Sequence, residues 1–170
     1  SRDAITALRE YAPGAEVVID GLVYQSAGIT LNWHAPASES QVKEIQSIRQ
    51  SWRCTSCGAS GTALAVGGLD RCSACGAEIK SSQRFSFLET AGFAVDLYEP
   101  THTDVSVQSY VPVESPWINA EGEWRPLPNP VLGNFRSSST GRVFNHSSGI
   151  NGKGYAICLE CGRAEPMPAY

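Results

Sequence analysis

Three copies of the pattern Cys-x-x-Cys-Gly constrain this chain more than any other feature. They occupy residues 54–58, 72–76 and 158–162, and together they contain all six cysteines. Two thiolates three positions apart can bind one tetrahedral ion, and the glycine that follows can adopt the positive φ that turns the backbone toward the sulfurs. The spacing therefore predicts metal-binding knuckles rather than disulfides within each motif.

The first two knuckles predict one closed metal site. Cys54, Cys57, Cys72 and Cys75 supply four soft ligands, and the 14 residues between the knuckles are rich in glycine and alanine. This spacing is typical of a zinc ribbon, whose structural ion leaves no position open for water. A rubredoxin-like iron centre uses similar knuckles, but the availability of zinc and the short spacing favour zinc. We expect one zinc ion per chain.

The third knuckle, Cys158 and Cys161, has no matching pair of cysteines. Three explanations are open: the remaining ligands lie beyond Tyr170, His146 or His102 completes the site, or the thiols are free. We favour the first explanation because tetrahedral zinc takes four ligands. The chain also begins without an initiator methionine, so we expect it to be a piece of a larger protein with a truncated site.

Composition indicates a folded protein of acidic character. Hydrophobic residues make up 42% of the 170 residues, and the formal net charge is −4. Such a balance argues against nucleic-acid binding by overall charge alone. The candidates for phosphate contacts are Arg53, Arg71 and Arg84 beside the ribbon, although surface charges are their commoner role. With no long apolar run or secretory segment, we expect a cytoplasmic protein that has no membrane contact.

Sequence patterns predict an α+β fold that is mostly β, with small antiparallel sheets, a four-cysteine zinc-ribbon insert and one or two helices near the N-terminus. Residues 2–10 have helical spacing, and residues 16–19 and 22–26 flank Asp20-Gly21, a strong hairpin signal. Apolar residues then recur every three or four positions from residue 38 to residue 52. This spacing predicts an amphipathic helix that leads into the first knuckle.

The remainder of the chain predicts short strands and irregular connections. The expected strands are residues 84–88, 93–98, 105–111, 134–137, 142–145 and 154–158. Between them lies a proline-rich stretch that holds Trp117 and Trp124, the two candidates for base stacking. We expect three consecutive parts: a helix-hairpin-helix segment over 1–51, the ribbon over 52–80, and a β-rich domain over 81–170.

No catalytic motif is recognisable. The chain lacks a phosphate-binding loop, a nucleophile elbow and a His-Glu-x-x-His motif, so we expect no small-molecule substrate. An enzyme remains an alternative if His102, Asp104 and His146 surround a metal. A cleft that brings these three side chains together would support it.

Several segments resemble a known family. Residues 8–14 and 17–24 resemble the segment that follows the motor domains of large bacterial superfamily-two helicase-like proteins. Residues 89–96 and 154–164 are similar to their C-terminal zinc-binding module of uncharacterised function, which mitomycin-repair helicases share with components of DISARM-type phage defence.

The resemblance implies a role as an accessory region of a DNA-translocating, ATP-driven protein in repair or antiviral defence. Its partners would be the parent motor domains or a helicase subunit, with DNA as a further ligand. In that family the last knuckle is followed by further cysteines that complete a four-cysteine site. The leading hypothesis is a noncatalytic zinc-binding module that supports DNA engagement or complex assembly, and the alternative is a protein-interaction scaffold without nucleic-acid contact.

Overall fold

The chain folds into two compact units, each built from separate stretches of sequence. The computed structural model describes residues 3–31, 47–64, 70–106, 108–120 and 122–170. Unit 1 comprises Ser1–Ile48, Leu88–Ser115 and Asn145–Tyr170, and unit 2 comprises Arg49–Phe87 and Pro116–Phe144. The boundaries of these units do not coincide with the consecutive parts 1–51, 52–80 and 81–170 expected from the sequence.

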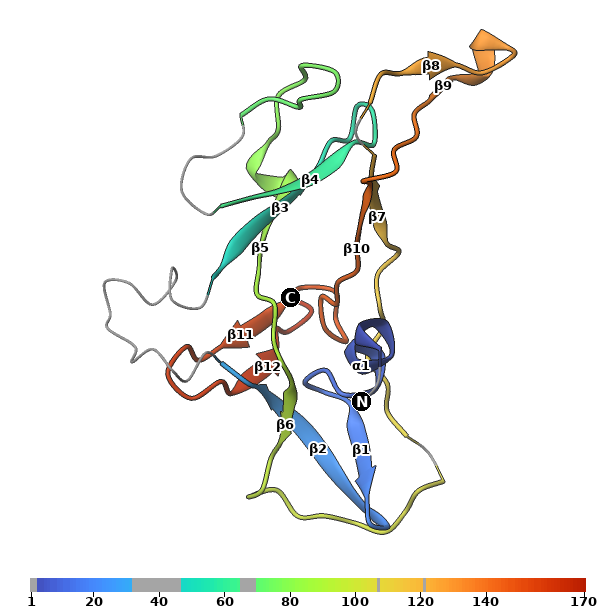
Figure 1. The fold of residues 1–170 in the computed structure, drawn as a ribbon. Coiled ribbons are helices and arrows are strands. Elements are labelled where there is room, and N and C mark those ends of the chain that lie inside the picture. Colours follow the sequence, from blue (N-terminus) through green and yellow to red (C-terminus); the bar gives the residue numbers. More distant parts are fainter. Residues whose placement is uncertain (1–2, 32–46, 65–69, 107, 121) are drawn as a thin grey trace. The chain divides into compact units, whose positions relative to one another are not determined.

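The described residues of unit 1 form one helix and two small antiparallel sheets (Figure 1). Strand β2 lies between β1 and β6 in the first sheet, and β11 pairs with β12 in the second. The bounds are α1 Ala4–Glu10, β1 Glu16–Ile19, β2 Leu22–Ile29, β6 Phe93–Val95, β11 Tyr155–Ile157 and β12 Ala164–Pro166.

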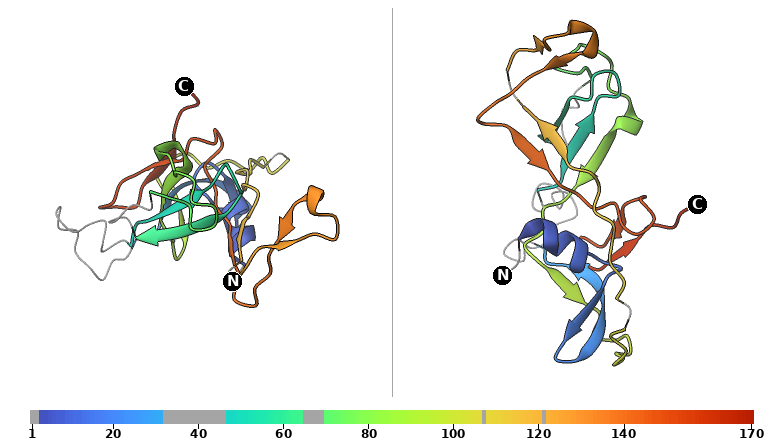
Figure 2. Two further views of the ribbon diagram at one scale, coloured as in Figure 1. Left: turned by 90° about the horizontal axis from the view of Figure 1, so that it is seen from above. Right: turned by 90° about the vertical axis from the view of Figure 1, so that its right-hand side faces the viewer.

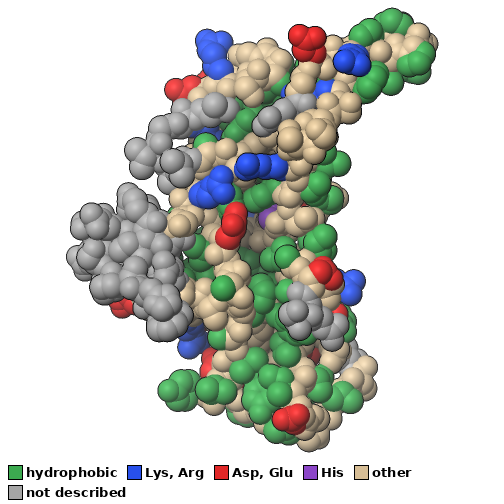
Figure 3. Space-filling view, viewed as in Figure 1, with side chains coloured by type: hydrophobic (Ala, Val, Ile, Leu, Met, Phe, Trp, Pro, Cys, Tyr) green, Lys and Arg blue, Asp and Glu red, His purple; other side chains and the backbone are tan. Residues whose placement is uncertain are grey.

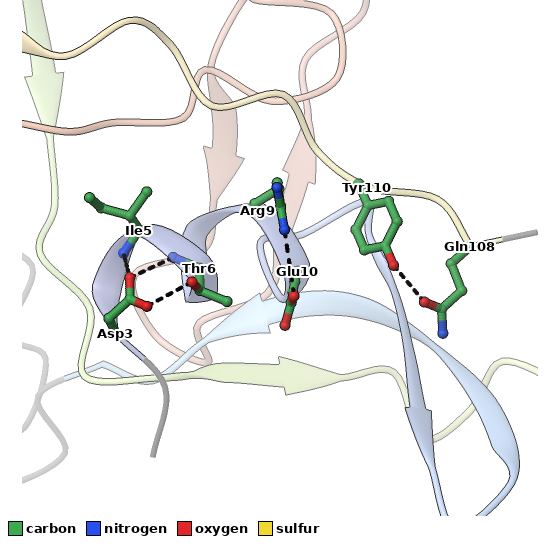
Figure 4. Close-up of polar contacts among 7 residues, drawn as sticks. All are labelled: Asp3, Ile5, Thr6, Arg9, Glu10, Gln108 and Tyr110. Carbon is green, nitrogen blue, oxygen red and sulfur yellow. Dashed lines mark hydrogen bonds and ion pairs between the residues drawn. The ribbon is translucent and has the colours of Figure 1, made fainter.

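Helix α1 begins at a side-chain cap. The Asp3 carboxylate accepts hydrogen bonds from the backbone N–H groups of Ile5 and Thr6 at 3.1 and 3.0 Å (Figure 4). The Thr6 hydroxyl donates to the same carboxylate at 2.7 Å. These bonds satisfy N–H groups that have no partner within the helix, and they lower the pKa of Asp3.

The turn after α1 forms the small core of unit 1. Ala12, Ala15 and Val111 are fully buried, and Phe93 from β6 packs against them. The buried Ser26 hydroxyl of β2 donates to the backbone of the α1 C-terminus at 2.6 Å. A buried hydroxyl without a partner would oppose folding, so this bond fixes the hairpin against the helix end.

Where the structure describes it, unit 2 has strands and two single 3-10 turns as its regular elements. Strand β3 is central in a three-stranded antiparallel sheet of order β4-β3-β5, and β7–β10 and β8–β9 form two-stranded ribbons, seen in Figures 1 and 2. The bounds are β3 Arg49–Arg53, β4 Ser60–Leu64, η1 Ser81–Gln83, β5 Arg84–Phe87, β7 Trp117–Asn119, β8 Arg125–Pro126, η2 Pro130–Leu132, β9 Asn134–Phe135 and β10 Arg142–Phe144.

The structure confirms the mostly β class and the first hairpin but corrects two sequence predictions. The last part of the predicted helix, residues 49–52, is strand β3, while residues 38–46 lie outside the described residues. Trp52 pairs with Gly61 of β4, and this cross-strand partner overrides the helical spacing. The prediction of a strand over 105–111 is also wrong, because the described residues of this range form none. Instead, the Asp104 carboxylate accepts a hydrogen bond from the Ser106 N–H in a tight turn.

Candidate metal centre

The structure gathers the four cysteines of the first two knuckles in unit 2. The sulfur atoms of Cys54, Cys57, Cys72 and Cys75 all lie within 4.8 Å of one another, so they could hold a metal ion. Cys54 is 3.7 Å from Cys75, and Cys57 is 3.6 Å from Cys72. All four are thiols rather than disulfides in the structure. The prediction that these four side chains converge is therefore confirmed.

Each knuckle is built by the same two backbone hydrogen bonds. In the first, the Cys54 N–H donates to Ala59 at 2.7 Å and the Gly58 N–H donates back to Cys54 at 2.9 Å. The second knuckle, residues 72–77, repeats these bonds at 2.7 and 2.8 Å. The glycine of each knuckle has φ +74°, the left-handed conformation that the sequence predicted for it.

The thiols perturb one another's ionisation. Burial alone would raise the pKa of Cys54, but backbone N–H donors from Cys57 and Ser56 and the neighbouring thiols lower it to about 6. Burial, together with the neighbouring thiols, raises the pKa of Cys57 to about 12, although the backbone N–H of Ala59 acts to lower it. One thiol of the group thus ionises readily and suppresses ionisation of the next. A divalent cation would remove this conflict by replacing the shared protons.

The centre sits in a core of small side chains. Cys54 and Cys72 are themselves buried core residues, packed with Trp52, Ala59 and Ile79. Among the described residues of this group, Trp52 and Ile79 are the only large side chains, so apolar burial beyond these two contributes little here. The fold of this region therefore depends on whatever holds the four sulfurs together.

Polar bonds from η1 and β5 connect the sheet with the first knuckle and with the residues that flank the second. The Gln83 side-chain amide donates to the Arg53 carbonyl at 3.2 Å and to the Thr55 hydroxyl at 3.1 Å. Arg84 donates to the Ile79 carbonyl at 2.7 Å and forms an ion pair with Asp70 at 3.2 Å.

The three arginines predicted to contact phosphate lie in different environments. Arg84 is largely enclosed by the bonds just described, and the exposed Arg71 donates to Gly76 of its own knuckle at 3.3 Å. The guanidinium of Arg53 lies 5.9 Å from the ring centre of Trp117 and is exposed. Arg53 is therefore the one of the three that combines exposure with an aromatic neighbour.

Sequence reasoning missed an aromatic cluster around Trp117. Phe85 lies 6.0 Å from Trp117, Trp117 lies 5.6 Å from Phe144, and Phe144 lies 4.8 Å from Phe87. Phe85 keeps 52% of its surface exposed. The alternation of side chains along a strand over residues 84–87 is a signal that could have placed Phe85 and Phe87 on one face, but their partners from β7 and β10 are distant in sequence. Trp124 lies apart, 4.7 Å from Arg136.

Charge divides unequally between the two units. Unit 2 contains eight Lys and Arg against four Asp and Glu, a formal charge of +4, whereas unit 1 contains five against thirteen, a charge of −8. A zinc ion bound by four thiolates would add −2 to unit 2 and leave it positive. The acidic net charge of the chain therefore conceals a basic unit.

The third knuckle lies in unit 1, between β11 and β12. The Cys158 N–H donates to Arg163 at 2.8 Å, and the Gly162 N–H donates to Cys158 at 2.9 Å. Both thiols are exposed. Among the described residues, no third His, Cys, Asp or Glu joins them in a group that could hold a metal.

The structure does not bring the alternative metal residues together. His102, Asp104 and His146 form no metal-ligand group within the described part of the chain. His102 lies 3.7 Å from Glu16, and Asp104 bonds to Ser106. Burial lowers the pKa of the half-buried His146, while the nearby Glu114 raises it.

Comparisons with known proteins give no relative. No protein-family profile, curated protein or solved structure matches the chain. No helix among residues 3–31, 47–64, 70–106, 108–120 and 122–170 has the length and apolar character that a membrane crossing requires.

Proposed function

We propose that this chain is a noncatalytic, zinc-binding accessory module of a larger DNA helicase or helicase-associated protein, which supports DNA engagement or complex assembly in repair or phage defence. The convergence of four cysteine sulfurs within 4.8 Å is the observation that carries the proposal. A tetrahedral set of four thiolates selects zinc over the hard cations magnesium and calcium. The helicase context rests on the resemblance of residues 89–96 and 154–164.

Zinc would act as a structural ion. The core around Trp52 and Ile79 contains two of the cysteines themselves and little other apolar bulk. Metal binding would therefore supply much of the free energy that orders this part of unit 2, on the order of 10 kcal/mol for a structural site. A cytoplasmic location fits this role, because a reducing compartment keeps the thiols available to the metal.

The charge of unit 2 supports DNA engagement. Its formal charge of +4 contrasts with −8 for unit 1, so electrostatic attraction to phosphates would act on the zinc-bearing unit. Arg53, Trp117 and Phe85 adjoin one another on this unit and offer both a cation and exposed ring surface. Such a combination suits a single strand, whose unpaired bases can stack on aromatic side chains.

A salt-dependent binding titration tests the proposal. The zinc-loaded chain is mixed with a fluorescent single-stranded oligonucleotide at several salt concentrations, and log K is plotted against log salt. We expect the parent chain to bind at low salt. For the Arg53→Gln variant, the slope of log K against log salt should be smaller in magnitude by about 1. Arg9→Gln in unit 1 is the matched control and should leave the slope unchanged.

Absence of binding at low salt would favour the second candidate, a protein-interaction scaffold. Unit 1 supports this candidate with its charge of −8 and with exposed apolar residues after β6. Leu97 and Tyr98 keep 79% and 97% of their surface exposed. Hydrophobic side chains also reach the molecular surface near the β1–β2 hairpin (Figure 3).

A further inference from the structure

Residues 117–120 and 122–144 of unit 2 form one nested hairpin, which we call the arm. Strands β8 and β9 lie between β7 and β10 in sequence, and each pair is antiparallel. The segments that join the two pairs also run beside each other, because a β-carbon on Gly122 would lie 3.2 Å from the Ser137 carbonyl oxygen. The arm therefore extends from Trp117 of the aromatic cluster to the turn η2 at its far end, as Figures 1 and 2 show.

Backbone constraints hold the turn at the end of the arm in one conformation. Proline occupies every second position from residue 126 to residue 130, and each proline fixes its own φ. The Asn129 side chain accepts a hydrogen bond from the Val131 N–H at 3.2 Å. The Leu127 N–H donates to the Gly133 carbonyl at 3.0 Å and closes the loop. A ligand that contacts this turn therefore meets a preorganised surface, which lowers the entropic cost of binding.

The tip of the arm consists of two adjacent aliphatic side chains in solvent. Val131 and Leu132 keep 90% and 74% of their surface exposed. A turn that only reverses the chain commonly uses glycine, proline and small polar residues. Phe135, which follows the turn on β9, is also exposed. Since the described part of the chain leaves these side chains uncovered, their apolar surface is available to a ligand.

Two arginines flank the tip. The guanidinium of Arg136 lies 4.7 Å from the ring centre of Trp124, whose indole is itself exposed. Arg125 is exposed on β8. Residues 124–136 contain these two cations and no Asp or Glu. The end of the arm therefore combines a rigid apolar tip with a positively charged base, on a unit whose formal charge is +4.

Charge and size favour a nucleic acid as the ligand of this surface. Proteins that unstack DNA insert apolar side chains between base steps, while arginine binds the phosphates beside them. A stable protein interface needs about 20 residues on each side, which is more than the 13-residue segment 124–136 offers. Insertion into a membrane gains strength with buried apolar area, and two aliphatic side chains supply little of it.

We propose that the DNA engaged by unit 2 is a junction between single and double strands, and that Val131 and Leu132 form the wedge that enters the last base step of the duplex. This inference rests on the proposed DNA engagement. The last base pair is the easiest to unstack, because it is stacked on one side only. Arg125 and Arg136 contact the phosphates beside it, and the aromatic cluster at the base of the arm receives the unpaired strand.

A forked oligonucleotide with 2-aminopurine in its last base pair tests the proposal, because the fluorescence of this base rises when it is unstacked. The zinc-loaded parent chain should produce this rise. The Val131→Ser/Leu132→Ser variant should lose it and bind the fork about tenfold more weakly, with unchanged affinity for a single-stranded oligonucleotide. Zinc content and circular dichroism confirm that the variant is folded, as the exposure of both side chains leads us to expect.

Ile118→Ser/Val143→Ser is the matched control. These two aliphatic side chains are directly opposite each other in the β7–β10 ribbon and are also exposed, but they lie away from the tip. This variant should keep both the fluorescence rise and the affinity for the fork. An equal loss in the two double variants would overturn the proposal, because it would show that the tip has no special role.

Failure of the wedge and failure of DNA engagement give different results. Binding to the single strand and the fork without a fluorescence rise, or a rise that the tip variant retains, would reject the wedge alone. Absence of binding to either oligonucleotide would reject DNA engagement and the wedge together. Cosedimentation of the parent chain with phosphatidylserine vesicles, lost in the tip variant, would assign the tip to a membrane surface and overturn the proposal.

Discussion

Arg53 and Arg84 lie on opposite faces of the β4–β3–β5 sheet. Arg84 is directly opposite Trp52 in the β3–β5 register, and directly opposed residues share a face. Arg53 follows Trp52 along β3, so its side chain emerges on the other face. The two arginines therefore cannot form one phosphate-binding track. Arg84 belongs to the ribbon's own fold, whereas Arg53 remains available to a ligand.

This relationship predicts different outcomes for two similar substitutions. Arg84→Gln removes the 2.7 Å bond to the Ile79 carbonyl and the ion pair with Asp70, so it should lower the free energy of unfolding of unit 2 by about 1–3 kcal/mol. Arg53→Gln should change it by less than about 0.5 kcal/mol. Denaturant unfolding of the zinc-loaded variants, followed by tryptophan fluorescence, gives both values. Equal losses would contradict the assignment of Arg84 to the fold.

Local sequence patterns predicted the elements whose geometry is decided within a few residues. The knuckles follow from cysteine spacing and glycine conformation, and the first hairpin follows from Asp20-Gly21, whose φ angles are 52° and 79°. Convergence of Cys54 with Cys75 could also be predicted, because a thiolate quartet satisfies one tetrahedral ion.

Non-local partners decided the features that the sequence could not reveal. The spacing of apolar residues up to Trp52 predicted a helix, but Trp52 pairs with Gly61 in a sheet. The indole ring packs on this glycine, and that contact favours the strand. The aromatic cluster joins Phe85 to residues 117 and 144, more than 30 positions away. Unit 2 likewise combines two distant stretches, so its positive charge is hidden in the net charge of the chain.

Gly61→Ala should destabilise unit 2 through Trp52. A β-carbon at this position would lie 2.8–3.0 Å from three atoms of the indole ring, which is closer than ordinary contact. We expect a loss of about 1–3 kcal/mol in the free energy of unfolding. Trp52→Phe removes those ring atoms, so the loss caused by Gly61→Ala should shrink in a chain that already carries Trp52→Phe. A double-mutant cycle in denaturant measures this coupling, and additive effects would exclude the contact.

Alanine substitutions at the glycines of the first and third knuckles would distinguish the cost of backbone strain from the cost of a steric collision. Gly58 and Gly162 have φ of +74° and +81°, but a β-carbon on Gly58 meets no atom within 4 Å. Gly58→Ala should cost about 1 kcal/mol from strain alone, whereas Gly162→Ala should cost at least twice as much because it also displaces Ile29. Hydrogen exchange of the Cys54 and Ile29 amides reports the two sites. Equal loss of protection at both would contradict the collision.

Removal of the metal should unfold part of the molecule. A chelator that strips the ribbon should expose Trp52 and shift its fluorescence to longer wavelength, because Cys54 and Cys72 form part of the core around it. The unit 1 core around Ala12 and Val111 contains no cysteine, so its amides should remain protected from exchange. Cys72→Ser should reproduce the effect, and Cys158→Ser should not. Simultaneous loss of protection in both units would show that the metal supports the whole chain.

His146 gives unit 1 a pH dependence of its own. Burial lowers its pKa from the ordinary value of 6.5, so the unfolded chain binds a proton at a higher pH than the folded chain does. The folded state therefore loses stability as the pH falls from about 7 through 6.5 toward the lower folded pKa, with a slope of at most about 1.4 kcal/mol per pH unit.

His146→Gln removes the proton that causes this slope. Urea unfolding of the parent chain and the variant, at closely spaced pH values and with saturating zinc, gives the two free energies of unfolding. The value of the parent minus that of the variant should decrease as the pH falls. Thiol protonation affects both proteins alike and cancels from that difference. A difference that stays constant between pH 7 and 5 would mean that His146 titrates alike in the folded and unfolded chain, in contradiction to its burial.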